Sequence, residues 1–357
     1  MIPSGRATVR AAQLLPSLLT AGELAPFNES VRHAQMTILS RNGPVYLDVY
    51  ASVSSAPPLP GLRGGIVIVP GVGDNRGVPQ LINFSQSLAQ TGLVVMVMTT
   101  PTLINYDLSI QDSVGVVQTF KALARWPGVS SERIGIVSFS AGASLACFAA
   151  VDPRIRDQVA FVVLFGGYFD ATTLLRAFGQ RAIIVDGQKQ PWQPQVVPIR
   201  TLSNAITRTL PPSERALLVN SFAPGGKPLR ANELARLSPT AAAAYHLLMG
   251  DRPDQVDAHL ASLSPQMHAQ LAELSPSRFI DGVRAPIYLL HDRADDSIPF
   301  TESRNFAAAL TRLGHPHDFA EFGIFHHVQV RPGIGVERFG DVLHLFRMLR
   351  EVLLVSS

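Results

Sequence analysis

The sequence predicts an α/β protein built on a mostly parallel sheet, with helices on both faces and a helical insertion. From Gly65 onward, short continuous apolar runs alternate with segments of helical periodicity, as in strands buried between two helical layers. Before them, the strict alternation in residues 45–53 predicts a strand with one wet face. It pairs with residues 31–39 in an antiparallel hairpin turned at Asn42-Gly43-Pro44.

The hairpin and six further strands give an eight-stranded sheet. The six strands are expected at residues 66–69, 94–98, 134–139, 160–165, 287–291 and 318–322. Helices are expected between them at 78–90, 111–125, 141–150 and 301–313, with a closing helix at 336–354 and a Pro-rich linker at 56–60.

One large core with an insertion accounts for the length of 357 residues, 46% of them hydrophobic. We expect an N-terminal extension at residues 1–30, docked on the body as an amphipathic segment, a core made of 31–167 and 276–357, and a helical cap insertion at 168–275. Within the insertion, Ser-Pro pairs at Ser238, Ser264 and Ser275 predict helix N-caps. Residues 186–198 are expected to form a loop.

Charge and composition exclude several classes of function. The isoelectric point is about 9.2, but the net charge is only +3 and no basic run follows the chain, so we expect no nucleic-acid partner. No apolar run is long enough for a transmembrane helix. The single cysteine, Cys147, is read as a helix-packing residue and suits a reducing, cytoplasmic compartment. A faint signal-peptide pattern near the N-terminus leaves export as the alternative, and the oligomeric state stays open.

Ser140 is the candidate nucleophile. It lies in Ser138-Phe-Ser-Ala-Gly142, between an apolar strand and a helix of small residues. Such a sharp turn needs small residues two positions before and after the serine, and both Ser138 and Gly142 are small. The alternative is that Ser140 only caps the helix.

Asp295 is the candidate acid, because it lies on the loop that follows an apolar strand, in His291-Asp-Arg-Ala-Asp-Asp-Ser-Ile-Pro299. A carboxylate there can orient an imidazole and stabilise its protonated form. Turn formation or helix capping by Asp295 and Asp296 is the alternative reading. Asp170, after the preceding core strand, is a lesser candidate.

His327 is the candidate base, with the adjacent His326 as the alternate. Both follow the last core strand, where a loop can bring an imidazole over the nucleophile. The order Ser140, Asp295, His327 places three groups after three different strands. Because parallel strands end at the same edge, these groups are expected to meet.

A glycine-rich loop, Pro70-Gly-Val-Gly-Asp-Asn-Arg-Gly77, follows the first core strand. Its backbone amides can face the pocket, and we expect the N–H groups of Val72 and Ala141 to form an oxyanion hole. A dinucleotide-binding loop is the rival reading, but Arg76 stands where the third glycine would be needed.

With these motifs, the chain resembles the α/β-hydrolase superfamily. More narrowly, it resembles bacterial dienelactone-hydrolase-like or prolyl-oligopeptidase-like serine esterases with a helical cap. Ser-Phe-Ser-Ala-Gly, Leu164-Phe-Gly-Gly-Tyr168 and the motif around Asp295 carry the resemblance over about residues 31–354. Two departures are Ser138, in place of the usual glycine, and Pro70-Gly71, in place of His-Gly.

The resulting hypothesis is a serine hydrolase that cleaves small-molecule carboxylic esters through an acyl-enzyme and needs no metal or organic cofactor. Peptidase and acyltransferase activities fit the same residues. A non-catalytic, hydrolase-like binding protein is the alternative from another class, since one fold hosts unrelated functions.

Overall fold

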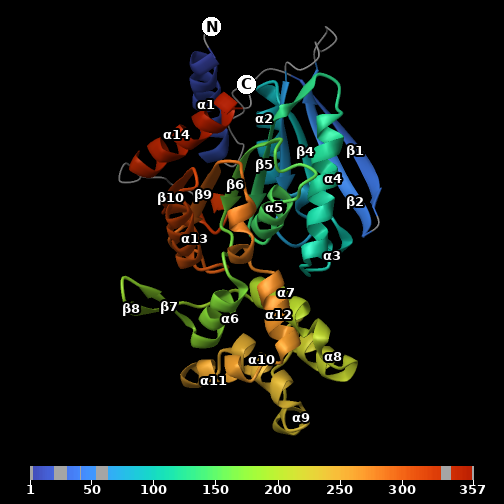
Figure 1. The fold of residues 1–357 in the computed structure, drawn as a ribbon, viewed down its shortest axis with the longest axis vertical. Helices are drawn as coiled ribbons and strands as arrows, with labels where there is room; N and C mark the ends of the chain where they lie inside the picture. Colours follow the sequence, from blue (N-terminus) through green and yellow to red (C-terminus); the bar gives the residue numbers. More distant parts are fainter. Residues whose placement is uncertain (1–2, 20–29, 41, 54–62, 331–338, 356–357) are drawn as a thin grey trace.

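An eight-stranded sheet forms the centre of the molecule (Figure 1), in a computed structural model that describes residues 3–19, 30–40, 42–53, 63–330 and 339–355. The strand order is β1-β2-β4-β3-β5-β6-β9-β10. The pairs β1/β2 and β2/β4 are antiparallel, and the other neighbours are parallel. The predicted mostly parallel α/β sheet is therefore confirmed.

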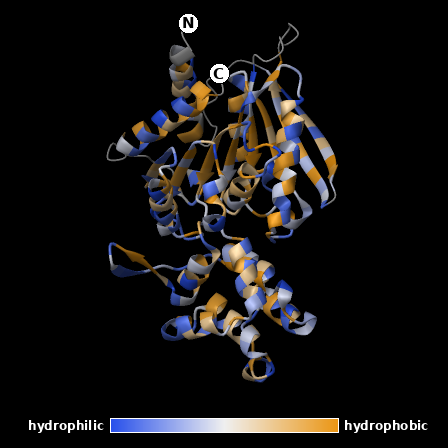
Figure 2. Cartoon of the chain, in the orientation of Figure 1, coloured by the Kyte–Doolittle hydropathy of each residue, from blue (hydrophilic) through white to orange (hydrophobic). Residues whose placement is uncertain are grey.

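All eight predicted strands are present; most bounds agree within one residue, but β3 begins three residues and β5 five residues before the predicted start. Their bounds are β1 (Val31–Ser40), β2 (Gly43–Ser52), β3 (Arg63–Val69), β4 (Val94–Thr99), β5 (Val129–Phe139), β6 (Val159–Phe165), β9 (Ile287–Asp292) and β10 (His317–Phe322). Figure 2 shows the central strands mostly in the colours of apolar residues, as expected for strands covered on both sides.

Two helical layers cover the sheet. On one face α4 (Ser113–Ala124), α5 (Gly142–Ala150) and α13 (Phe300–Leu313) share an apolar core with the strands. On the other face, α1 (Pro3–Leu19), α2 (Pro79–Gln90) and α14 (Phe339–Val355) enclose a second core. The short α3 (Pro101–Ile104) follows β4.

The N-terminal segment forms a helix that docks on the body, as predicted for an amphipathic segment. In α1, Ala7, Ala11 and Leu14 are fully buried, and their spacing of four and three residues places them on one face. The helix contacts α14 and α2. Residues 336–338 of the predicted closing helix and the predicted linker at 56–60 lie outside the described residues.

The elements between β6 and β9 lie beyond one end of the sheet (Figure 1). The helices there are α6 (Ala171–Gln180), α7 (Val196–Ile206), α8 (Pro212–Ser221), α9 (Ala231–Leu234), α10 (Pro239–Met249), α11 (Val256–Ala261) and α12 (Pro265–Glu273). Ser238 and Ser264 cap α10 and α12 as predicted, accepting bonds from Ala241 N and Met267 N.

At the third predicted cap, Ser275 has the N-cap position with a proline in the first turn, but the predicted capping bond to the short 3₁₀ turn that follows it is absent. Its buried hydroxyl instead accepts from Ala171 N at 2.8 Å and donates to Leu271 O at 2.7 Å. The hydroxyl thus joins the start of α6, which is distant in sequence, to the end of α12, which directly precedes it.

The predicted loop at residues 186–198 is also wrong. A hairpin is formed by β7 (Ala182–Val185) and β8 (Gln188–Pro191). The segment 186–198 contains the turn of this hairpin, its second strand β8 and the first turn of α7. The connection is the dipeptide Asp186-Gly187, with φ values of +51° and +78°. Positive φ at both central residues matches the right-handed twist of a two-residue hairpin, which is why Asp-Gly favours it.

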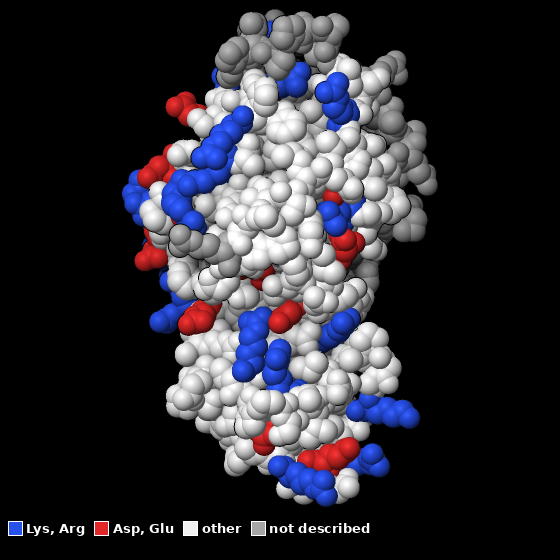
Figure 3. Space-filling view, turned by 90° about the vertical axis from the view of Figure 1, so that its right-hand side faces the viewer, with Lys and Arg blue, Asp and Glu red and all other residues white. Residues whose placement is uncertain are grey.

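No helix in the described ranges is long and apolar enough to cross a membrane. On the face shown in Figure 3, basic and acidic side chains are interspersed. Burial raises the pKa of the Cys147 thiol to about 12, in agreement with its prediction as a packing residue.

Candidate active site

Ser140 lies in a strained turn between β5 and α5. Its φ is +53°, in the left-handed region that residues other than glycine rarely adopt. A Cβ added to Gly142 would lie 2.3 Å from Pro70 O, and one added to Gly71 would lie 3.0 Å from the Ser140 Cβ. Glycine at both positions therefore lets the strand, the loop and the helix approach closely enough to project the serine outward.

The structure does not support the reading of Ser140 as a helix cap. The N-cap residue of α5 is Ala141, and no side chain caps the first turn. Ser138, the departure from the usual glycine, is fully buried and donates from its hydroxyl to Val163 O at 2.7 Å. The extra hydroxyl thus has a hydrogen-bond partner on the neighbouring strand.

Asp295 is buried on the loop after β9 and meets four partners. Oδ1 accepts from the backbone N–H groups of Ser297 and Ile298 at 2.7 and 2.9 Å. Oδ2 lies 2.6 Å from His327 Nδ1 and 3.2 Å from His291 Nε2. Oδ1 therefore forms the turn, as the alternative reading has it, while Oδ2 faces His327 and leaves the predicted role as acid open to both readings.

The electrostatics of this carboxyl follow from its partners. Burial by itself raises the pKa of Asp295, but His327 and, to a lesser degree, His291 outweigh burial and hold the pKa well below its usual range. The side chain is therefore ionised wherever the protein is folded near neutral pH. A buried anion beside His327 can hold that ring in a fixed orientation.

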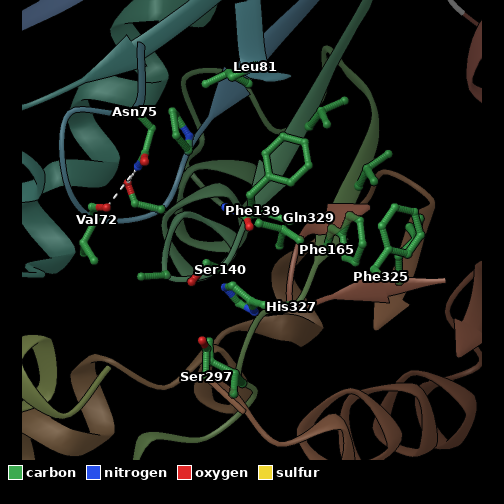
Figure 4. A pocket seen from close by; sticks show the side chains of 18 of the residues that line it. Val72, Asn75, Leu81, Phe139, Ser140, Phe165, Ser297, Phe325, His327 and Gln329 are labelled. Atoms are coloured by element: carbon green, nitrogen blue, oxygen red, sulfur yellow. Dashed lines mark hydrogen bonds between the residues drawn. The ribbon is translucent and has the colours of Figure 1, made fainter. Parts of the chain in front are cut away.

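His327 stands at the first position of a two-residue turn between β11 (Phe325–His326) and β12 (Gln329–Val330). Its φ is +55°, a second left-handed residue in the site. Because Nδ1 faces the carboxylate, the proton is assigned to Nδ1, which leaves Nε2 able to accept one. Figure 4 shows the His327 ring and the Ser140 side chain pointing toward one another.

The alternate base, His326, belongs to β11, and its side chain lies outside the described part of the chain. The lesser acid candidate, Asp170, lies at the N-terminus of α6. Its Oδ1 caps α6 by accepting from Thr172 N and Thr173 N, and its Oδ2 accepts from the Ser277 hydroxyl at 2.8 Å.

The loop after β3 passes over the serine. Asn75 donates from its amide to Gly71 O at 3.0 Å and to Val72 O at 2.9 Å, so one side chain fixes the loop (Figure 4). Within the described residues, neither Val72 N–H nor Ala141 N–H donates to a protein acceptor. The oxyanion hole formed by these two amides stays a prediction, and no hydrogen bond between protein groups competes with it.

The sequence did not predict four contributors to this site. His291, fully buried, bridges Asp295, Ile298 O and the Ser303 hydroxyl. Asn75, described above, is the second. Asp292 is the third: its Oδ2 accepts from Phe325 N at 2.9 Å and so anchors the hairpin that carries His327. Trp192 is the fourth, and its indole N–H donates to Asp295 O at 2.8 Å. For His291 and Asp292 the only signal was their place in the same motif as Asp295.

A cavity of about 420 Å³ opens at Ser140 and His327. Gln195, which follows the β7–β8 hairpin, lines it and donates from its backbone N–H to Asp296 O at 2.8 Å. The segment that enters α7 is thereby tied to the acid-bearing loop.

The sheet order, the strained serine turn and the histidine and carboxylate after later strands define the class of protein: the molecule has the α/β-hydrolase fold. No protein-family model matches the sequence, and a comparison with curated proteins finds no match.

Solved structures of that fold are similar to this chain. Dipeptidyl peptidase 4 of Porphyromonas gingivalis matches with a TM-score of 0.54 and 11% identity, over 94% of this chain and 37% of its own. A puromycin-hydrolysing peptidase of Mycobacterium tuberculosis matches with 0.51 and 16%, over 91% and 39%. A puromycin hydrolase matches with 0.54 and 14%, over 93% and 40%. This chain thus spans about two-fifths of the length of these proteins.

Proposed function

We propose that this chain is a serine hydrolase that cleaves carboxylic esters, with Ser140 as nucleophile, His327 as base and Asp295 as acid. The observation that carries the proposal is the 2.6 Å contact between His327 and the buried Asp295, made beside a serine held at positive φ. A base oriented in this way beside a serine is what nucleophilic catalysis requires.

In the proposed reaction, Ser140 Oγ bonds to the ester carbonyl carbon while His327 Nε2 takes the hydroxyl proton. The carbon–oxygen bond to the alcohol then breaks, and His327 gives that proton to the leaving alcohol. Water, deprotonated by the same imidazole, releases the acid and restores Ser140. Val72 N–H and Ala141 N–H hold the oxyanion in both steps, and each such donor contributes about 3 kcal/mol.

Intact-mass measurement after treatment with a fluorophosphonate tests the proposal. We expect one adduct in the wild type and none in Ser140→Ala, together with hydrolysis of p-nitrophenyl acetate that falls by about 10³ or more in Ser140→Ala. A chain that forms no Ser140-dependent adduct and shows no Ser140-dependent turnover would instead be the binding protein considered above.

Peptide or amide cleavage is the second candidate, favoured by the peptidases among the similar structures. Against substrates with a free N-terminus, the described residues that line the cavity include no carboxylate to bind an ammonium group. Comparing turnover of p-nitrophenyl esters with that of aminoacyl p-nitroanilides separates the two candidates.

A further inference from the structure

The cavity at Ser140 extends between the central strands and the helices on one face. On β5 the lining residues are Val137 and Phe139, and on β6 they are Val163 and Phe165. Residues two apart in a strand project to the same side. One apolar sheet face therefore runs away from Ser140, and Figure 4 shows Phe139 and, farther from the serine, Phe165 in the same pocket.

Two helices form the opposite wall. Leu345, Met348 and Val352 of α14 line the cavity, a spacing of three and four residues that defines one helix face. Leu81 and Phe84 of α2 line it in the same way. We call the space between these strands and helices the strand–helix arm.

The lining is mostly apolar, and its polar members, among them Gln80, Gln195 and Gln329, are mostly uncharged. Among the described residues around the whole cavity, none is Lys, Arg, Asp or Glu, and His327 is the one residue that carries charge in the proposed reaction. A charged substrate group would lose its hydration here without an ionic partner, which is costly. Protein interiors are closely packed, and an apolar space of about 420 Å³ that reaches a serine is in the size range of ligand sites.

We propose that the strand–helix arm binds the alkyl chain of a long, unbranched acyl group, so that the preferred substrates are medium- and long-chain carboxylic esters. This inference rests on the proposed function, because the carbonyl of such an ester sits at Ser140 while its chain lies between the sheet and α2 and α14. The leaving alcohol then faces the opposite side, toward Gln195 and α7.

The experiment measures kcat/KM for p-nitrophenyl acetate, butyrate, octanoate and laurate. Burial of each methylene is worth roughly a fourfold gain, so we expect octanoate to exceed acetate by about 100-fold or more even with incomplete burial. A flat or falling series in an enzyme that hydrolyses acetate through Ser140 would overturn the inference and leave the proposed function standing.

Substitutions in the two walls of the strand–helix arm test whether the alkyl chain binds there. Met348→Phe on α14 and Leu81→Trp on α2 each fill the arm from one wall, and we expect each to lower the octanoate-to-acetate ratio of kcat/KM by about tenfold or more. The ratio is taken within each variant, so a general loss of active protein cancels. Leu343→Phe is the matched control, because Leu343 lies on α14, is 38% exposed and does not line the cavity. If both filling variants keep the wild-type ratio, the arm does not hold the chain.

A binding measurement tests the inference even if the protein shows no turnover. Calorimetry of methyl octanoate with Ser140→Ala should show binding that Met348→Phe weakens in the double variant. Binding without Ser140-dependent turnover in the wild type would reject the proposed function and retain the apolar site. Absence of binding would reject the site.

Discussion

Asp295→Asn tests the proposed arrangement most directly. The asparagine carbonyl can still accept the bonds that Oδ1 takes from Ser297 N and Ile298 N. Its amide nitrogen, however, replaces Oδ2 and presents a donor to His327 Nδ1. The imidazole must then carry its proton on Nε2, and it can no longer accept the proton of Ser140.

The expected loss follows from that change of tautomer. Loss of the correct tautomer lowers kcat by about 10³ to 10⁴ in a serine triad, which corresponds to roughly 4–5.5 kcal/mol. The assay is hydrolysis of a p-nitrophenyl ester, with KM expected to change little. Asp296→Asn is the matched control. Asp296 is half-buried, lies on the same loop as Asp295, and accepts a hydrogen bond from the side chain of Gln195. The reasoning is wrong if Asp295→Asn keeps kcat within tenfold of the wild type.

The same substitution predicts a change in acid stability. The pKa of Asp295 is lower in the folded than in the unfolded protein, so its contribution to stability is present above about pH 4 and is lost as the pH falls below that value. The difference in unfolding free energy between wild type and Asp295→Asn should therefore shrink on acidification. Urea unfolding at a series of pH values measures it, and a difference that grows with acid would contradict the sign.

Three further outcomes are expected. Gly142→Ala places a Cβ 2.3 Å from a backbone oxygen and should markedly lower the midpoint of thermal unfolding, whereas Gly77→Ala, whose Cβ meets nothing within 4 Å, should not. Asn75→Ala frees the loop over the serine and should lower kcat by about tenfold or more with little change in KM, measured by ester hydrolysis. His291→Phe removes the buried contacts to Asp295, Ile298 O and the Ser303 hydroxyl, and should cost about 2 kcal/mol or more in urea unfolding. His291 positions Asp295, so this substitution should also alter the pH profile of kcat, which a purely structural role would leave unchanged.

Local chemistry made most of the fold predictable. Strands buried on both faces read as continuous apolar runs, and helices that face a sheet read as periodic ones, so the element order followed from the chain alone. Errors arose where an element depends on its surroundings. Asp186-Gly187 favours a hairpin turn, but the second strand of that hairpin, Gln188–Pro191, is short, polar and exposed. The Ser275 hydroxyl makes no capping bond because Leu271 O and the distant Ala171 N take it instead.

By itself the sequence determined the α/β class and the candidate residues Ser140, Asp295 and His327, because each follows an apolar strand and parallel strands end at one edge. Only the tertiary structure revealed the second histidine on Asp295, the asparagine that fixes the loop over the serine, and the apolar arm behind it. His291 lies four residues from Asp295, and Asn75 lies within four residues of the loop carbonyls it contacts, but the folded loops decide where their side chains point. The walls of the arm come from strands and helices far apart in the chain, and only packing brings them together.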